Sequence, residues 1–327
     1  MKRKIQRLAC VIATLTMILL GIHILGFIVR PEATDEVYYQ IETLHRLPKD
    51  SVEVILYGSS HTFRGVDAMH MYESHGIGAY NYGWHWQQIN TVNLFLQDSL
   101  LSQTPKVAAI ETYYCDSVMT DSNLNSEIYY SRYIHNKDAL REYLHQCFGD
   151  NWKRYAAYYM PIIALHDNWS ALTYRNLEPL EYSGYLLSSM GSCRSDWVTP
   201  IPTPYLVNPP QKELPEIAIA ELDKIVATCR ENGTEILFFT IPYQGEFYYA
   251  DALAQYAERN GAAYLNLFEY IDEIGLDGAT DFSDLDHLNT SGAVKVAEFL
   301  GAYIAEHYDV TDMRTIQNNV WQQALDQ

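Results

Sequence analysis

Five short apolar runs alternate with segments of helical periodicity along most of this 327-residue chain. Short, nearly continuous apolar runs are typical of parallel strands that are buried on both faces. Their alternation with helices predicts an α/β fold, a three-layer doubly wound sheet of five parallel strands. The five runs are residues 52–58, 78–83, 106–114, 235–243 and 262–270.

The alternation stops over residues 116–212, which are rich in Tyr and Trp and end in a proline-rich stretch. Helical spacing is seen there only near residues 137–147 and 152–165. A long insertion in an α/β domain usually forms a lid or a substrate wall. We therefore expect one domain over residues 52–327 that contains the insertion 116–212, preceded by a connector over 31–51 with one helix near residues 36–47.

The first thirty residues carry the signature of a membrane anchor. Lys2, Arg3, Lys4 and Arg7 precede an apolar run over 8–29 that contains no charged residue. At about 1.5 Å per residue this run can cross a hydrocarbon core of roughly 30 Å. A cleaved signal peptide is the alternative, but the run is longer than a usual signal core and no small-x-small cleavage site precedes Arg30. We expect residues 1–30 to be a single-pass anchor with a cytoplasmic N-terminus and the following domain to be extracytoplasmic.

The part of the chain after the anchor is strongly acidic. Five of the 22 basic residues and none of the 41 acidic ones lie in residues 1–30, so the remainder carries 17 − 41 = −24. Such a charge repels nucleic acid and anionic membrane surfaces and tolerates neutral or cationic glycans better. Four cysteines follow the anchor and allow three disulfide pairings, among which the sequence does not choose, and no spacing indicates a metal site or a cofactor.

Gly58-Ser59-Ser60 follows the first predicted strand and precedes a helix. Backbone N–H groups at such a turn can stabilise an oxyanion, which suits a serine nucleophile. By itself, a Gly-Ser-Ser turn is more often structural, and the G-x-S-x-G pattern of α/β-hydrolases is absent because His61 and Thr62 follow.

Asp284 and His287 lie three residues apart in the loop before the last helix. A serine hydroxyl needs a base to become nucleophilic, and an imidazole needs a carboxylate that holds its tautomer. Asp281 and Asp286 compete with Asp284 for that role. The loop with Ser60 and the loop with His287 open on the same edge of the predicted sheet, where the ligand crevice of such folds lies.

This layout resembles the SGNH (GDSL-like) hydrolase superfamily, with YGSSH as its first block and DLDHLNTSG as its last. The likeness covers residues 53–114 and 216–307 and is closest to membrane-anchored proteins of alginate O-acetylation and teichoic-acid D-alanylation. It implies a flavodoxin-like sheet with Ser60 as nucleophile, Asp284 as orienting acid and His287 as base. It also implies that the backbone of Ser60 and of Gly83 supplies oxyanion donors. ETYYCD after the third strand departs from the expected Gly-x-Asn-Asp, so the asparagine donor of the family is not in its usual place.

The resemblance implies a serine-dependent acyl-ester enzyme, either an O-acyltransferase or an esterase, that acts on a cell-envelope polysaccharide. His61, Trp84 and His85 are candidates for substrate contact. A transferase would need a multi-spanning membrane protein as its acyl donor. The alternative is a non-catalytic glycan-binding or assembly protein that retains the fold.

Overall fold

The computed structural model describes residues 2–120, 126–204 and 209–326. Within it the chain forms two compact units. The first contains residues 1–38, 120–133 and 144–181, and the second contains residues 39–119, 134–143 and 182–327. The predicted insertion is thus shared between the two units, and the predicted domain bounds stay a prediction.

The second unit is built on a sheet of five parallel strands in the order β2-β1-β3-β4-β5. Every residue of the edge strand β2 and of the interior strands β1 and β3 is buried, as expected for strands covered on both faces. The predicted α/β fold with a five-stranded parallel sheet is confirmed. The strands are β1 (Val54–Tyr57), β2 (Ala79–Asn81), β3 (Val107–Glu111), β4 (Glu235–Thr240) and β5 (Ala263–Asn266).

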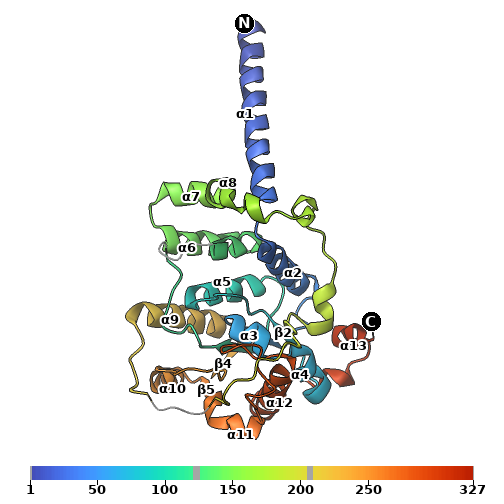
Figure 1. The fold of residues 1–327 in the computed structure, drawn as a ribbon, viewed down its shortest axis with the longest axis vertical. Helices are drawn as coiled ribbons and strands as arrows, with labels where there is room; N and C mark the ends of the chain where they lie inside the picture. Colours follow the sequence, from blue (N-terminus) through green and yellow to red (C-terminus); the bar gives the residue numbers. More distant parts are fainter. Residues whose placement is uncertain (1, 121–125, 205–208, 327) are drawn as a thin grey trace. The chain divides into compact units, whose positions relative to one another are not determined.

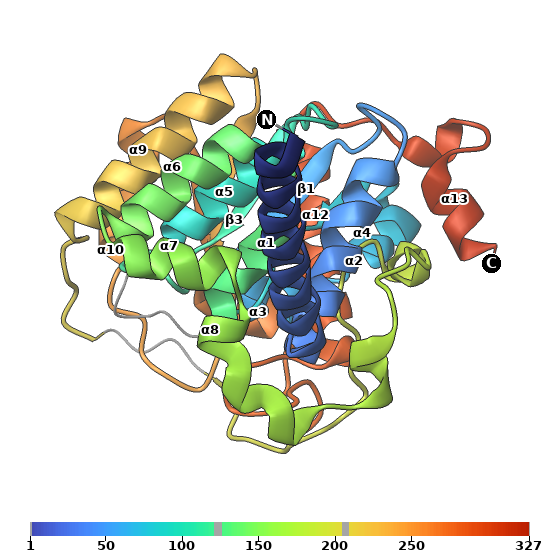
Figure 2. The same ribbon diagram turned by 90° about the horizontal axis from the view of Figure 1, so that it is seen from above.

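Helices cover both faces of this sheet. The helices α5 and α9 lie side by side on one face, and α3, α4 and α12 pack together on the other (Figures 1 and 2). The order of the strands reverses between β1 and β3, and in such sheets a ligand crevice lies beyond the carboxyl ends of the strands at that point. The helices with most of their residues in this unit are α2 (Glu32–Arg46), α3 (Ser60–Gly65), α4 (Ala68–His75), α5 (Ile89–Ser99), α6 (Lys137–Phe148), α9 (Glu216–Glu231), α10 (Ala250–Arg259), α11 (Ile271–Ile274), α12 (Thr290–His307) and α13 (Val320–Leu325).

The strands are shorter than the apolar runs that predicted them. The run over 262–270 is a strand only to Asn266 and continues as a 3₁₀ turn, Leu267–Tyr270. The side chains of Leu267 and Phe268 are still buried in this turn, so a hydrophobic run reports burial beyond the end of the strand. No disulfide joins the cysteines of the described chain.

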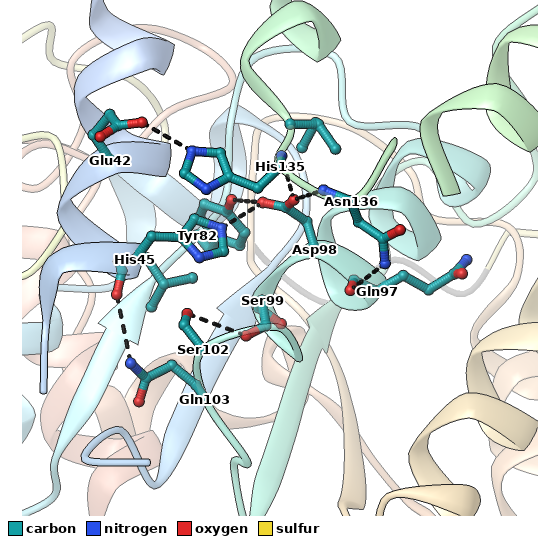
Figure 3. A network of polar contacts seen from close by, with 12 residues as sticks. Glu42, His45, Tyr82, Gln97, Asp98, Ser99, Ser102, Gln103, His135 and Asn136 are labelled. Carbon is teal, nitrogen blue, oxygen red and sulfur yellow. Dashed lines mark hydrogen bonds and ion pairs between the residues drawn. The ribbon is translucent and has the colours of Figure 1, made fainter. Parts of the chain in front are cut away.

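A buried carboxylate joins three segments of the second unit on the side of α5 (Figure 3). The side chain of Asp98 is fully buried and pairs with the Nε2 atom of His45 on α2 at 2.8 Å. It also accepts hydrogen bonds from the Tyr82 hydroxyl and from the backbone N–H groups of His135 and Asn136. The network therefore ties the end of α2 and the segment before α6 to α5.

The first unit contains α1 (Lys2–Ile28), α7 (Trp152–Tyr159) and α8 (Ile162–Leu165). Within the described residues, α1 is the helix that is long and apolar enough to cross a membrane. The predicted helical piece 152–165 is in fact two helices, because Pro161 cannot donate a backbone hydrogen bond and disfavours helical geometry at the residue before it. In both ribbon views α7 runs across the direction of α1 (Figures 1 and 2).

Candidate active site

A tight turn places Ser60 at the carboxyl end of β1. Gly58 has a φ of +140°, and a Cβ atom there would lie 2.8 Å from the Cβ of Glu111. Ser59 is the N-cap of α3, and its hydroxyl accepts the N–H of His61 at 3.3 Å. Ser60 is thus the first residue of α3, a position that only a glycine at 58 allows the chain to reach.

The structure brings Ser60, His287 and Asp284 together. The Nε2 atom of His287 lies 2.8 Å from Ser60 Oγ, and its Nδ1 atom lies 2.8 and 3.0 Å from the two carboxylate oxygens of Asp284. Burial opposes ionisation of Asp284, but its hydrogen bonds with the backbone N–H groups of Asp286 and His287 and with the imidazole hold its pKa below the usual range. The arrangement orients one ring nitrogen by a carboxylate and points the other at a serine hydroxyl.

The structure also distinguishes Asp281, Asp284 and Asp286, the three candidates for the acid that orients His287. Asp281 is buried and forms an ion pair with Lys295 at 2.7 Å, and it accepts the Ser291 hydroxyl at 2.8 Å. Asp286 is exposed, and its contact with the site is the N–H that it donates to Asp284. Asp284 is therefore the acid that meets His287.

The other predicted oxyanion donor is the N–H of Gly83, in the turn after β2. Its N–H already donates to Asn81 Oδ1 at 3.1 Å, so the donor that the family resemblance assigns to an oxyanion is used within the turn after β2. The N–H of Ser60, in contrast, makes no hydrogen bond with any residue that the structure describes. The backbone of Ser60 remains a candidate donor.

Glu111 is a site residue that the sequence reasoning missed. It ends β3, and its carboxyl accepts the Ser59 hydroxyl at 3.3 Å and the Tyr113 N–H at 2.8 Å. The backbone N–H groups of Ser59 and Ile241 also point to it. Burial raises the pKa of Glu111 to about 8, although these hydrogen bonds favour the charged form. The sequence does contain one indication of this role, because Glu111 is an acidic residue at the end of an otherwise apolar strand.

His61 is buried beside the pair of Ser60 and His287. Its ring stacks on Tyr113 with centroids 3.8 Å apart and lies 5.3 Å from the ring of His287. Its Nδ1 atom is buried without a hydrogen-bond partner among the residues that the structure describes, and burial together with the nearby His287 holds its pKa well below the usual value. His61 is thus a neutral ring in the wall of the site.

The two other residues predicted to contact substrate differ from each other. His85 is half-buried, and burial lowers its pKa to about 4, with a smaller effect from Arg64 and His287. Trp84 is only 4% exposed and stacks on Phe63. The exposed aromatic of this loop is Trp86, 51% exposed and stacked on Tyr114.

Arg64 follows Ser60 by one helical turn and was also not singled out from the sequence. Its guanidinium lies 3.7 Å from Asp284, beyond hydrogen-bond distance, and its Nε atom is buried without a hydrogen-bond partner in the described part of the chain. Among the described residues, no group of three or more His, Cys, Asp or Glu side chains could hold a metal ion.

Comparisons with known proteins add little to this geometry. No family model matches the chain, and no curated protein matches it. A similar solved structure is that of a protein from Bacteroides fragilis NCTC 9343 described as a putative acylhydrolase, with a TM-score of 0.41 and 9% sequence identity. The match covers 85% of this chain and 98% of that chain. A likeness at this level does not bear on the chemistry of this chain.

Proposed function

We propose that this chain is a serine-dependent acyl-ester enzyme with Ser60 as nucleophile, His287 as general base and Asp284 as orienting acid. One observation carries the proposal: His287 lies 2.8 Å from Ser60 Oγ through one nitrogen and 2.8 Å from Asp284 through the other. A base within hydrogen-bond reach of a hydroxyl, itself oriented by a carboxylate, is the arrangement that activates serine.

The reaction would run in two halves. The Ser60 hydroxyl attacks the acyl carbonyl while its proton passes to His287 Nε2, and the Ser60 N–H donates to the developing oxyanion. The intermediate collapses to an acyl-serine as His287 returns the proton to the departing alkoxide. The acceptor, water or a sugar hydroxyl, then attacks the acyl-serine and loses its proton to His287. As the bond between Ser60 and the acyl group breaks, His287 returns that proton to Ser60 Oγ, and the acyl group leaves on the acceptor.

The setting that we propose is the cell envelope, with a polysaccharide as substrate. An apolar helix at the N-terminus would hold the domain at a membrane, and the −24 charge beyond residue 30 disfavours nucleic acid as a partner. If the acceptor is a glycan hydroxyl, the acyl group must come from a donor, and we propose a multi-spanning membrane protein for that role. If the acceptor is water, the chain is an esterase and needs no such partner.

The first test is turnover of p-nitrophenyl acetate by the full chain in detergent. Ser60→Ala and His287→Ala should reduce the rate to background, and Asp284→Asn should lower kcat by a factor on the order of 10²–10⁴ because the imidazole loses its orienting charge. Asp286→Asn is the matched control, a neighbouring exposed acid that does not touch the ring, and should retain most of the activity. Equal losses in Asp284→Asn and Asp286→Asn would contradict the assigned role of Asp284.

The rival function is a glycan-binding or assembly protein without turnover. The engaged N–H of Gly83 favours it, because losing one oxyanion donor costs on the order of 10²–10³ in rate. A fluorophosphonate probe distinguishes the two, since it labels an activated serine whether or not an acceptor is present. Labelling of the wild-type chain but not of Ser60→Ala would support an enzyme. No labelling, together with no turnover, would support the rival.

A further inference from the structure

Large apolar side chains are concentrated on one segment of the first unit. Residues 152–177 comprise α7, α8 and the 3₁₀ turns η3 (His166–Ala171) and η4 (Tyr174–Leu177). Single exposed side chains of this type are ordinary on a soluble protein, whereas a group of them close together marks an interaction surface. Six of them in this segment are between 49 and 71% exposed: Trp152, Tyr159, Ile163, Trp169, Tyr174 and Leu177.

The helix α7 separates a buried face from an exposed aromatic face. Trp152 and Tyr159 are seven residues apart, about two helical turns, and therefore lie on the same side of the helix. Tyr158 is buried, and its hydroxyl hydrogen-bonds to Ser131 at 2.9 Å. The packing of α7 within its own unit thus buries Tyr158 but leaves the side chains of Trp152 and Tyr159 exposed to solvent.

The same segment is fixed to the end of α1. The guanidinium of Arg30, 5% exposed, donates to the backbone oxygens of Arg175, Asn176 and Glu178. In return, the side-chain amide of Asn176 donates to the carbonyls of Ile28 and Arg30, both at 2.9 Å. These hydrogen bonds cap the carbonyl of Ile28, the last residue of α1, and that of Arg30 just beyond it. They therefore hold residues 175–178 beside the C-terminal end of α1.

Two further contacts close the junction between α1 and α8. The side chain of Asn168 donates to the carbonyl of Val29 at 3.0 Å. A Cβ atom on Gly26 would lie 3.1 Å from the ring of Pro161, so the backbones meet closely there. Residues 161–178 hence lie level with the final turn of α1.

That level coincides with the edge of a bilayer if α1 crosses one. The uncharged run over residues 8–29 is about 33 Å long as a helix, close to the roughly 30 Å of a hydrocarbon core. Its end therefore falls at the membrane–water interface, where Trp and Tyr are enriched. Because α7 crosses the direction of α1, its axis would lie close to the membrane plane (Figures 1 and 2).

The charge of the segment fits a lipid surface. Residues 152–177 contain Lys153, Arg154 and Arg175 and a single acid, Asp167, for a net charge of 3 − 1 = +2, in a chain that carries −24 beyond residue 30. Cations next to exposed aromatics are typical of segments that lie in the interface and meet anionic headgroups.

We propose that residues 152–177 form an interfacial platform that rests on the lipid bilayer at the C-terminal end of α1, with the six exposed side chains inserted among headgroups. The platform and α1 together hold the first unit against the membrane by two attachments, a span and a surface segment. The proposal rests on α1 spanning the bilayer and is independent of the chemistry at Ser60.

The test places the full chain in nanodiscs of phosphatidylcholine and phosphatidylglycerol, with or without bromine on the acyl chains near the headgroups. Bromine quenches tryptophan only at contact distance. We expect brominated lipid to remove about a third of the emission, since two of the six tryptophans lie in the platform. Trp152→Phe combined with Trp169→Phe should abolish the quenching.

The matched control is the pair Trp86→Phe and Trp197→Phe, which removes two tryptophans that are 51 and 72% exposed but lie outside the platform. This variant should retain the quenching. The single substitutions Trp152→Phe and Trp169→Phe, each expected to remove part of the effect, guard against a folding defect in the double variant. Quenching that survives in the Trp152 and Trp169 double variant would overturn the platform.

Labelling of Cys10, which lies in α1, with a membrane-impermeant maleimide separates failure of the anchor from failure of the platform. A spanning helix protects Cys10 until detergent is added, as read by mass spectrometry of its peptide. Protected Cys10 without tryptophan quenching would mean that α1 spans but that the segment does not touch lipid, which overturns the inference. A Cys10 that reacts before detergent is added would show that α1 does not span the bilayer, which overturns the premise of the inference.

Discussion

At the scale of single residues, the site depends on what holds the turn around Ser60. Glu111 accepts hydrogen bonds from both the hydroxyl and the backbone of Ser59, the residue directly before the proposed nucleophile. A neutral carboxyl there can do this without placing charge beneath an oxyanion, whereas a carboxylate would oppose one. We therefore treat Glu111 as a positioning residue. The titratable groups that it influences are Tyr113, Tyr114, Cys115, Tyr243 and Tyr264, and burial raises the pKa of each.

Glu111→Gln should change the pH profile of kcat. In the wild type the pKa of Glu111 is raised to about 8, so the carboxyl is neutral below that pH and becomes charged above it. Activity should therefore fall as the pH rises through about 8, and Glu111→Gln, which cannot ionise, should lose that alkaline limb. Turnover of p-nitrophenyl acetate between pH 6 and 10, corrected for spontaneous hydrolysis, measures it.

The same substitution has a stability signature of defined sign. The folded state raises the pKa of Glu111 from its ordinary value to about 8, so the folded chain binds this proton more tightly than the unfolded chain does. The stability that the bound proton contributes is therefore lost as the pH rises from that ordinary value towards about 8. Urea unfolding of Glu111→Gln should depend less on pH over that range than that of the wild type. An unchanged alkaline limb and an unchanged pH dependence of stability would show that Glu111 does not titrate as described.

At the scale of elements, the network around Asp98 joins α2, α5 and the segment that leads into α6 (Figure 3). The ring of His45 stacks on that of His135 with centroids 4.2 Å apart, and His135 pairs with Glu42 at 2.8 Å. Burial alone would raise the pKa of Asp98, but hydrogen bonds from His45, Asn136 and Tyr82 and the charge of His45 keep it below the usual value. A carboxylate so thoroughly paired is costly to disturb.

Asp98→Asn should lower the free energy of unfolding by about 3 kcal/mol at neutral pH, because an amide presents N–H groups to donors that need acceptors. The pKa of Asp98 is depressed, so its contribution is present at neutral pH and is lost as the pH falls through that lowered pKa. Asp138→Asn is the control, since the side chain of Asp138 is 88% exposed and pairs only at the surface with Arg141. Urea unfolding of both variants at neutral pH measures the difference, and equal stabilities would contradict the role of Asp98.

At the scale of the whole molecule, the two units serve different purposes. Ser60, His287 and Asp284 all belong to the sheet unit, whereas α1 and the platform belong to the first unit. We infer that the attachment and the chemistry can be changed separately. Arg30 is the residue that tests this, because its guanidinium reaches four backbone oxygens within the first unit.

Arg30→Gln should release the segment around Arg175 without affecting turnover. Loss of these hydrogen bonds raises the population of locally open chain, so tryptic cleavage at Arg175 should be roughly tenfold faster. Limited proteolysis in nanodiscs, read by mass spectrometry, measures the change against Arg7→Gln, which alters the exposed basic flank. Cleavage at the wild-type rate would show that Arg30 does not hold the segment.

The sequence by itself determined the features that depend on local periodicity and spacing. Alternating apolar runs and helical segments report which faces are buried, and this was enough for the five parallel strands and for the apolar helix at the N-terminus. The pairing of Asp284 with His287 is also local, because three residues on one turn bring the two side chains together.

Only the tertiary structure decided which residues meet across the chain. Glu111 reaches Ser59, 52 positions away, and Asp98 reaches His135, 37 positions away. The sequence also did not indicate that the Gly83 N–H donates to Asn81, or that Trp84 is buried while Trp86 is exposed. Periodicity records that a side chain is buried, but its partner is chosen by packing between elements that are distant in sequence, and no local pattern encodes that choice.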